Sequence, residues 1–178
     1  MPLHRRIPVA LAAAAALGAP ALALAAPTAK HIVISGGNKY KPGYYVMNDL
    51  HFGPRALTVK SGATVTVVNK GTAQEPHTVS FVKRAQVPRT AKAIDRCSNL
   101  QGGVCLQLAQ AHQADPQTGE VKVPVVDVGK PGVDRPGDSF FIAPGAKRLS
   151  FKITAKKGTT LHYFCVIHPW MQGTIKVR

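Results

Sequence analysis

Hydrophobic and polar residues alternate with a period of two over most of this chain. The alternating runs are rich in Val, Ile, Leu and Thr, and Gly, Pro or Asn bounds each of them. Because successive side chains of a strand point to opposite faces of a sheet, the pattern predicts half-buried β-strands. Short strands at this density are typical of an antiparallel all-β sandwich or barrel. The expected strands are 31–35, 56–59, 64–69, 77–81, 139–142, 149–154, 160–165 and 173–177.

Residues 83–137 interrupt this alternation. Residues 89–113 are richer in Ala, Gln, Leu and Lys, and residues 104–114 have the composition of about three helical turns. Residues 116–136 return to a loop of Pro, Gly and Asp. Such a long segment inside a small β domain is either functional or a covering flap. We therefore expect a partly helical insertion rather than a second domain.

Residues 1–25 have the features of an export signal. A basic start is followed by an uncharged run rich in Ala and Leu, which ends in the small-residue pattern at 23–25. Pro8 and Pro20 break the run, which disfavours an uncleaved membrane anchor. We expect a mature domain of residues 26–178, periplasmic or extracellular and without a membrane span. The export route stays open.

The chain is strongly basic, with 23 Lys and Arg against 8 Asp and Glu among 178 residues and a net charge of +15. A chain of this length can form one hydrophobic core. A basic surface attracts nucleic acid, anionic lipid or an acidic protein. Export and the absence of any run of five Lys or Arg argue against nucleic acid. A protein partner with an acidic face, or a solvated surface that only steers encounters, remains.

The three cysteines divide into a pair and a single residue. Cys97 and Cys105 lie close together in the inserted segment, and in an exported protein this indicates a local disulfide. A metal site there would need two further ligands, and only His112 is near. Cys165 has no disulfide partner, so an oxidising compartment requires another role for this thiol.

The end of the chain supplies that role. The alternation places Cys165 on the inward face, at the end of the predicted strand 160–165. His168 and Met171 follow at steps of three, in a loop that Pro169 stiffens. His77, at the start of an earlier strand, adds a second imidazole. Two imidazoles and a thiolate with a weak thioether suit copper in both oxidation states, whereas zinc gains little from a thioether.

At these positions the sequence resembles the cupredoxins, the small blue copper proteins. The motif Cys165-x-x-His168-Pro169-x-Met171 is similar to the amicyanin loop, and residues 75–79 resemble the plastocyanin stretch around the first ligand. Thr78 stands where an Asn usually follows the His. Its hydroxyl can still offer a hydrogen bond across the two ligand loops. The resemblance covers residues 58–81 and 139–177 but not 83–137.

The resemblance implies a Greek-key β-sandwich that binds one type I copper ion and carries single electrons. It assigns His77, Cys165, His168 and Met171 as the copper ligands, with His168 at the protein edge and Met171 as the weak axial ligand. It also implies a transient redox partner, met by a monomer that is not an enzyme. An apolar docking patch around Trp170 is one interpretation of that residue, and packing against the insertion is the other.

Two other functions come from different classes. A copper carrier that delivers the metal to an oxidase would use the same ligands. A copper oxidase or nitrite reductase is disfavoured because the chain has no His-x-His pair for a second copper centre. The remaining candidates are expected to play no part: Met47 in the core, and His31, His51 and His162 satisfied or at the surface.

Overall fold

The structure is a computed structural model that describes residues 30–71 and 74–178. The expected export signal, residues 1–25, lies outside the described residues. Within the described part of the chain, no helix has both the length and the apolar character needed to cross a bilayer.

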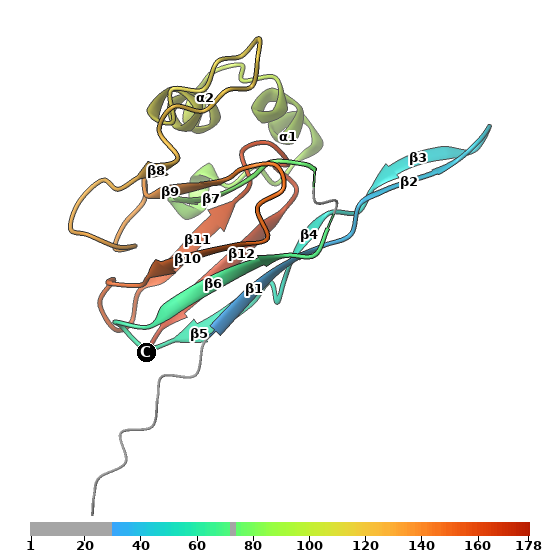
Figure 1. The fold of residues 1–178 in the computed structure, drawn as a ribbon. Coiled ribbons are helices and arrows are strands. Elements are labelled where there is room, and N and C mark those ends of the chain that lie inside the picture. Colours follow the sequence, from blue (N-terminus) through green and yellow to red (C-terminus); the bar gives the residue numbers. More distant parts are fainter. Residues whose placement is uncertain (1–29, 72–73) are drawn as a thin grey trace, which may run out of the picture.

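Two β-sheets face each other and form a sandwich (Figure 1). The smaller sheet has four strands, and β1 pairs with β6 in parallel while its other pairings are antiparallel. Its order across the sheet is β10 (Arg148–Lys152), β6 (Thr64–Asn69), β1 (Lys30–Ser35) and β4 (His51–Gly53).

The larger sheet has six strands and holds the C-terminal motif. β5 pairs with β12 in parallel, and all its other pairings are antiparallel. Its order is β5 (Ala56–Val59), β12 (Gln172–Val177), β11 (Thr160–Phe164), β7 (His77–Val82), β9 (Ser139–Ile142) and β8 (Val125–Val126).

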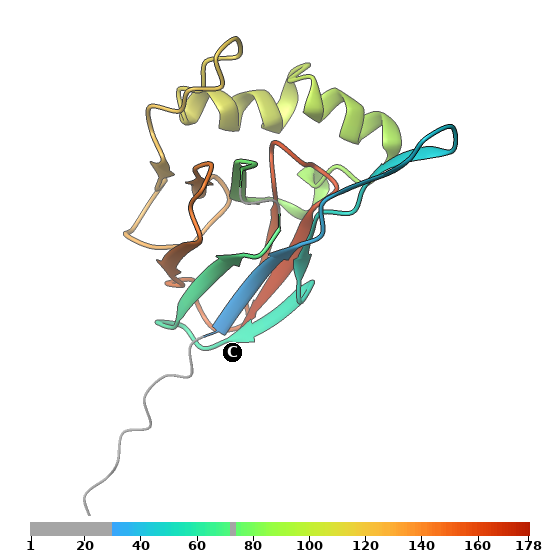
Figure 2. The same ribbon diagram turned by 45° about the vertical axis from the view of Figure 1, so that its right-hand side comes forward.

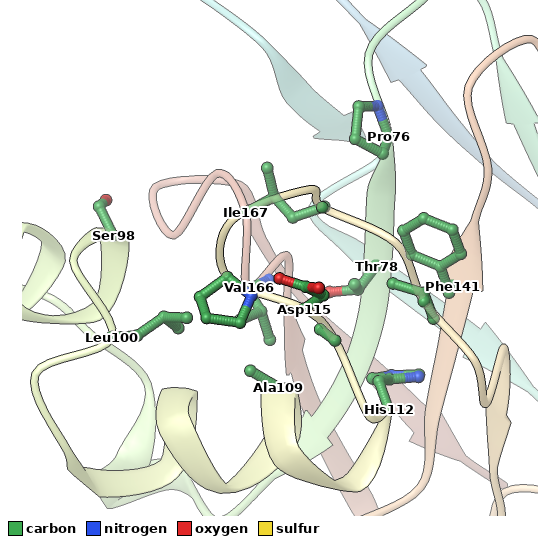
Figure 3. A pocket seen from close by; sticks show the side chains of 14 residues that line it. Pro76, Thr78, Ser98, Leu100, Ala109, His112, Asp115, Phe141, Val166 and Ile167 are labelled. Atoms are coloured by element: carbon green, nitrogen blue, oxygen red, sulfur yellow. The ribbon is translucent and has the colours of Figure 1, made fainter.

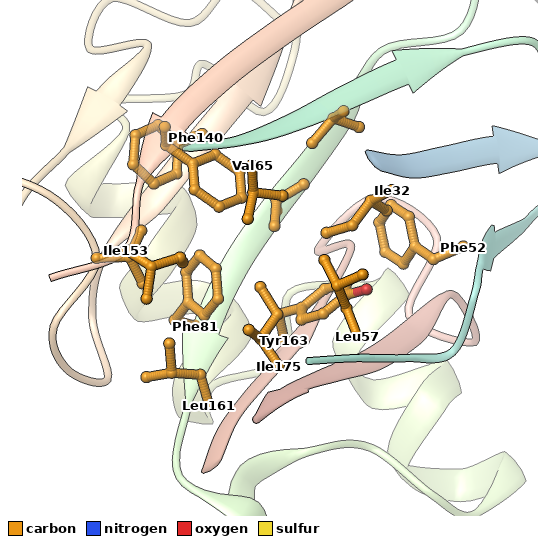
Figure 4. Packing of buried hydrophobic residues seen from close by; sticks show 14 of the residues in the cluster. Ile32, Phe52, Leu57, Val65, Phe81, Phe140, Ile153, Leu161, Tyr163 and Ile175 are labelled. Carbon is orange, nitrogen blue, oxygen red and sulfur yellow. The ribbon is translucent and has the colours of Figure 1, made fainter. Parts of the chain in front are cut away.

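The core lies between the two sheets (Figure 4). Alternate residues of most strands point into it, as in β5, where Leu57 and Val59 are buried and their neighbours are exposed. Aromatic rings from both sheets meet there, with 5.2 Å between the centroids of Phe52 and Tyr163. The alternation therefore produces the predicted all-β Greek-key sandwich, although two of the strand pairs are parallel.

Turn chemistry sets the strand boundaries. Between β5 and β6 the amide of Ala63 donates to the carbonyl of Lys60 at 3.1 Å, which closes a tight turn. Gly62 has a φ of +85° in this turn, a conformation that side chains with a Cβ rarely adopt. This fixed turn explains why β5 ends and β6 begins at the predicted residues; β9 also has the predicted boundaries.

The segment between β7 and β9 adds a second hydrophobic core. It holds a short 3-10 helix (Arg84–Gln86), α1 (Ala91–Ser98) and α2 (Gly103–Ala111), and the two α-helices lie over one end of the sandwich (Figure 2). Leu108 of α2 packs in one cluster with Val82 and Phe164 of the larger sheet. β7 is consequently buried along its whole length rather than on one face. The sequence predicted α2 but not α1.

A hairpin of β2 (Asn38–Lys41) and β3 (Tyr45–Asn48) projects from the sandwich (Figures 1 and 2). Its residues are mostly exposed, and Tyr40 and Val46 retain 75% and 84% of their accessible surface. Met47 lies on this hairpin and is 45% exposed, so its predicted core position is wrong. Both faces of this hairpin are exposed, so the sequence pattern of its strands does not indicate which residues belong to a core.

Candidate metal centre

Three of the four predicted ligands meet where β7 begins and β11 ends. His77 is the first residue of β7, and Cys165 follows the last residue of β11. A short loop then leads to β12. Two backbone hydrogen bonds close this loop: Cys165 N–H donates to the Met171 carbonyl at 3.0 Å, and Met171 N–H donates to the His168 carbonyl at 2.8 Å. The loop is therefore held between two paired strands.

The donor atoms of His77, Cys165 and His168 all lie within 4.8 Å of one another. Cys165 Sγ is 3.8 Å from His168 Nδ1, and the centroids of the two imidazole rings are 5.0 Å apart. His77 and Cys165 are fully buried, and His168 is 9% exposed. Met171, at the end of the loop, is also fully buried and belongs to the same core cluster as Cys165.

Burial controls the protonation of these groups. Together with a smaller effect of the neighbouring His168, it lowers the pKa of His77 to about 4. Burial also lowers the pKa of His168, although the Glu75 carboxylate opposes this effect. Burial raises the pKa of the Cys165 thiol, against hydrogen bonds from the Thr78 amide and its neighbours. The lowered pKa values favour the neutral form of both imidazoles at pH 7.

His77 provides the test of whether a metal ion fits. Both of its ring nitrogens are buried, and neither has a hydrogen-bond partner among the described residues. Leaving a buried polar atom without a partner costs about 1–3 kcal/mol. A metal ion between the two imidazoles and the thiol would satisfy one of these nitrogens, and a set of two nitrogens and one soft sulfur suits copper.

The sequence of residues 45–178 matches the family described as copper binding proteins, plastocyanin/azurin family. The chain belongs to this family. It is accordingly a copper electron-transfer protein of the cupredoxin type, and its His–Cys–His group supports a type I copper site. No curated protein sequence gives a significant match.

Several solved cupredoxins are similar to the chain. A purple cupredoxin from Nitrosopumilus maritimus has 17% identity and a TM-score of 0.43, over 84% of this chain and 99% of that one. A reduced auracyanin from Roseiflexus castenholzii has 19% identity and a TM-score of 0.43, over 86% and 98%. Amicyanin from Paracoccus versutus has 16% identity and a TM-score of 0.41, over 85% and 82%.

Thr78 joins the two ligand segments of this cupredoxin. Its amide donates to Cys165 Sγ at 3.3 Å, and its hydroxyl accepts a hydrogen bond from the Val166 amide at 2.8 Å. The predicted hydrogen bond across the ligand loops is confirmed. Because Val166 follows Cys165 directly, the two hydrogen bonds attach both the thiol and the next residue of the loop to β7.

A chain of buried polar groups leads from Thr78 to the helical segment. Ser80 Oγ donates to Thr78 Oγ1 at 3.0 Å and lies 2.6 Å from Ser139 Oγ. Ser139 Oγ is 2.7 Å from His112 Nε2, and His112 Nδ1 is 2.6 Å from the Val123 carbonyl. Sequence reasoning missed this chain, since its members lie on β7, β9 and the end of α2. The nearby Cys97 and Cys105 form the predicted disulfide, so His112 has no thiolate beside it.

A cavity of about 290 Å³ separates the helical segment from the ligand strands (Figure 3). Thr78 and Val166 line it from the sandwich, and Leu100, Ala109 and His112 line it from the segment. Its walls are mainly apolar side chains. The cavity thus borders Thr78 and Val166, the two residues that hydrogen-bond to each other beside Cys165.

Two side chains surround the outer edge of His168. The ring of Trp170 meets the His168 ring edge-on, with 5.3 Å between centroids, and Trp170 is 38% exposed. Glu75 Oε2 lies 3.4 Å from His168 Nε2, a contact that the sequence did not indicate. His31, His51 and His162 take no part in the centre: His31 and His51 are exposed, and His162 is partly buried on β11.

Proposed function

We propose that this chain is an exported protein that carries single electrons between redox partners, through one copper ion held by His77, Cys165, His168 and Met171. The observation that carries the proposal is the buried group of three donors within 4.8 Å of one another, with a His77 ring that lacks any other partner. Met171 completes the set as a buried thioether at the end of the same loop.

Each residue has a role that follows from its place. Cys165 provides the thiolate, buried against β7 and fixed by the Thr78 amide. His77 holds its ring in the interior, whereas His168 is the donor nearest the surface and so offers the path by which electrons enter and leave. Copper, when bound, would supply a one-electron couple whose potential depends on the thioether of Met171.

The rigidity of the site supports electron transfer. The three donors are attached to paired strands and to a loop closed by backbone hydrogen bonds. A centre held this way changes geometry little between oxidation states. The burial of all four side chains also shields a bound ion from competing chelators, which favours an electron carrier over the alternative of a copper-delivery protein.

The partner is a redox protein with an acidic docking face, met transiently by a monomer. The excess of 23 Lys and Arg over 8 acidic residues supports this charge complementarity. Trp170 and the edge of His168 form the contact patch. The mature protein comprises residues 26–178, with 83–137 as an insertion, in the periplasm or outside the cell. We expect rates of exchange to fall with added salt, because such steering is screened over about 10 Å at 0.1 M.

The test is a copper titration of the mature protein, followed by visible absorption and electron paramagnetic resonance. We expect one equivalent of copper, an intense visible band and a narrow hyperfine splitting from the thiolate bond. Cys165→Ser should abolish the band, whereas the double variant Cys97→Ser/Cys105→Ser should retain it. Colour in the Cys165 variant would contradict the ligand assignment. Rapid loss of copper to a chelator would favour copper delivery instead.

A further inference from the structure

The carboxylate of Glu75 lies at the outer edge of the candidate metal centre. Its Oε2 atom is 3.4 Å from His168 Nε2. The other ring nitrogen, Nδ1, faces Cys165 Sγ at 3.8 Å. The imidazole of His168 therefore lies between the thiol and a carboxylate, with one nitrogen directed at each.

Glu75 has no other strong partner at this oxygen. Oε2 is shielded from solvent and accepts no hydrogen bond within the described residues. No Lys or Arg of the described chain lies within ion-pair distance of Glu75, and the nearby Lys39 pairs with Asp49. Among the described residues, no Lys or Arg therefore neutralises the negative charge of Glu75, although the protein as a whole is strongly basic.

The base of the projecting hairpin holds the carboxylate in place. Asn38 Nδ2 donates to Glu75 Oε1 at 3.0 Å, and Asn48 Nδ2 donates to Asn38 Oδ1 at 2.9 Å. Asn48 Oδ1 in turn accepts from the Leu50 amide at 3.0 Å. The residues that support Glu75 therefore come from β2 and β3, far from the ligand loop in the sequence.

We propose that Glu75 is a positioning residue for His168, an inference that rests on the proposed function. Its Oε2, 3.4 Å from His168 Nε2, favours a proton on that nitrogen, and this is the tautomer that leaves Nδ1 free for the metal. A carboxylate behind a ligating histidine also makes that ligand more basic. Because the oxidised centre carries the greater positive charge, the fixed negative charge stabilises the oxidised state and lowers the reduction potential.

The first test is voltammetry of the copper-loaded protein. Glu75→Gln keeps the shape and removes the charge. We expect it to raise the potential by about 59 mV, the equivalent of a tenfold change for a one-electron couple. Glu75→Asp, which keeps the charge, should lie closer to the wild type. Asn38→Ala should shift the potential in the same direction as Glu75→Gln but by less, since it only frees the carboxylate.

Glu120→Gln is the matched control, because it removes the same charge from an exposed side chain of the 83–137 segment. Equal potentials for the Glu75→Gln and Glu120→Gln variants would overturn the proposal. A visible band that persists in the Glu75 variants shows that the copper centre itself is intact, so the two hypotheses fail separately.

A second readout needs no copper. In the metal-free wild type, nitrogen-detected NMR should find the His168 proton on Nε2 and protected from exchange with solvent. Glu75→Ala should remove this protection while His77 keeps its own signals. An unprotected Nε2–H in the wild type, or the other tautomer, would refute the role of Glu75 even if no copper centre formed.

Discussion

Replacing Thr78 by Val tests the contact that joins the two ligand segments. Thr78 is 4% exposed, and its hydroxyl accepts hydrogen bonds from the Val166 amide at 2.8 Å and from Ser80 Oγ at 3.0 Å. Valine has nearly the same shape but no acceptor. The Val166 N–H is then left buried beside Cys165 without a partner.

The expected loss of stability follows from these two contacts. An unsatisfied buried amide costs about 1–3 kcal/mol. Ser80 loses less, since it keeps its contact with Ser139 Oγ at 2.6 Å. We expect Thr78→Val to lower the free energy of unfolding by about 2 kcal/mol. Thr78→Ser retains the acceptor and removes one methyl group, so it should cost only about 0.8 kcal/mol.

The assay is urea unfolding of the metal-free variants at one pH, with the midpoints compared at a common slope. For a chain of this size, about 2 kcal/mol corresponds to a fall in melting temperature of about 4–8 °C. The more apolar substitution at this buried position should therefore be the more damaging one. A Thr78→Val protein as stable as the Thr78→Ser protein would refute the contribution of the Val166 hydrogen bond.

Three further predictions concern the helical segment and the ligand loop. Replacing Cys97 and Cys105 by Ala removes a disulfide with a sequence separation of 8. The chain-entropy model predicts that the free energy of unfolding falls by about 2.5 kcal/mol. Denaturant unfolding measures this, and an unchanged midpoint would contradict it. Burial lowers the pKa of His112, so below about pH 6.5 the unfolded chain binds more protons and the folded protein loses stability as the pH drops. His112→Gln should flatten this pH dependence; wild-type and variant stability curves that run parallel with pH would contradict it. Phe164→Ala should cost about 3–5 kcal/mol because Phe164 is fully buried. Trp170→Ala should cost less, because Trp170 is 38% exposed, and should slow electron self-exchange; the reverse order of stabilities would disprove this assignment.

Much of the sandwich could be predicted because its strands are buried on one face. In β5 and β6 the buried positions alternate, and a glycine turn separates the two strands. The hairpin of β2 and β3 has no buried face, so its pattern gave no strand signal. α1 was missed because only Cys97 of its eight residues is buried, which leaves no apolar face in the pattern; its one clear mark is Thr90, whose side chain accepts from the Ala93 amide at 3.2 Å.

The residues of the metal centre also fall into those that the sequence predicted and those that it did not. Cys165 and His168 lie a few residues apart, so their spacing suggested a site, and the pattern of the earlier strand offered His77 as a second imidazole. The contacts of Glu75 and His112 could not be predicted, because they join segments that are distant in the sequence. A glutamate before a proline, or a histidine at the end of a helix, has many possible neighbours until the fold places them.

The double burial of β7 limits how this chain could be shortened. A smaller electron carrier made by deleting 83–137 would uncover Val82, Phe164 and Val166, which now pack under α1 and α2. Exposed apolar residues on adjacent strands promote association between molecules. An engineer who removes the helices therefore has to replace these three side chains with polar ones, and has to give Ser139 a new partner in place of His112.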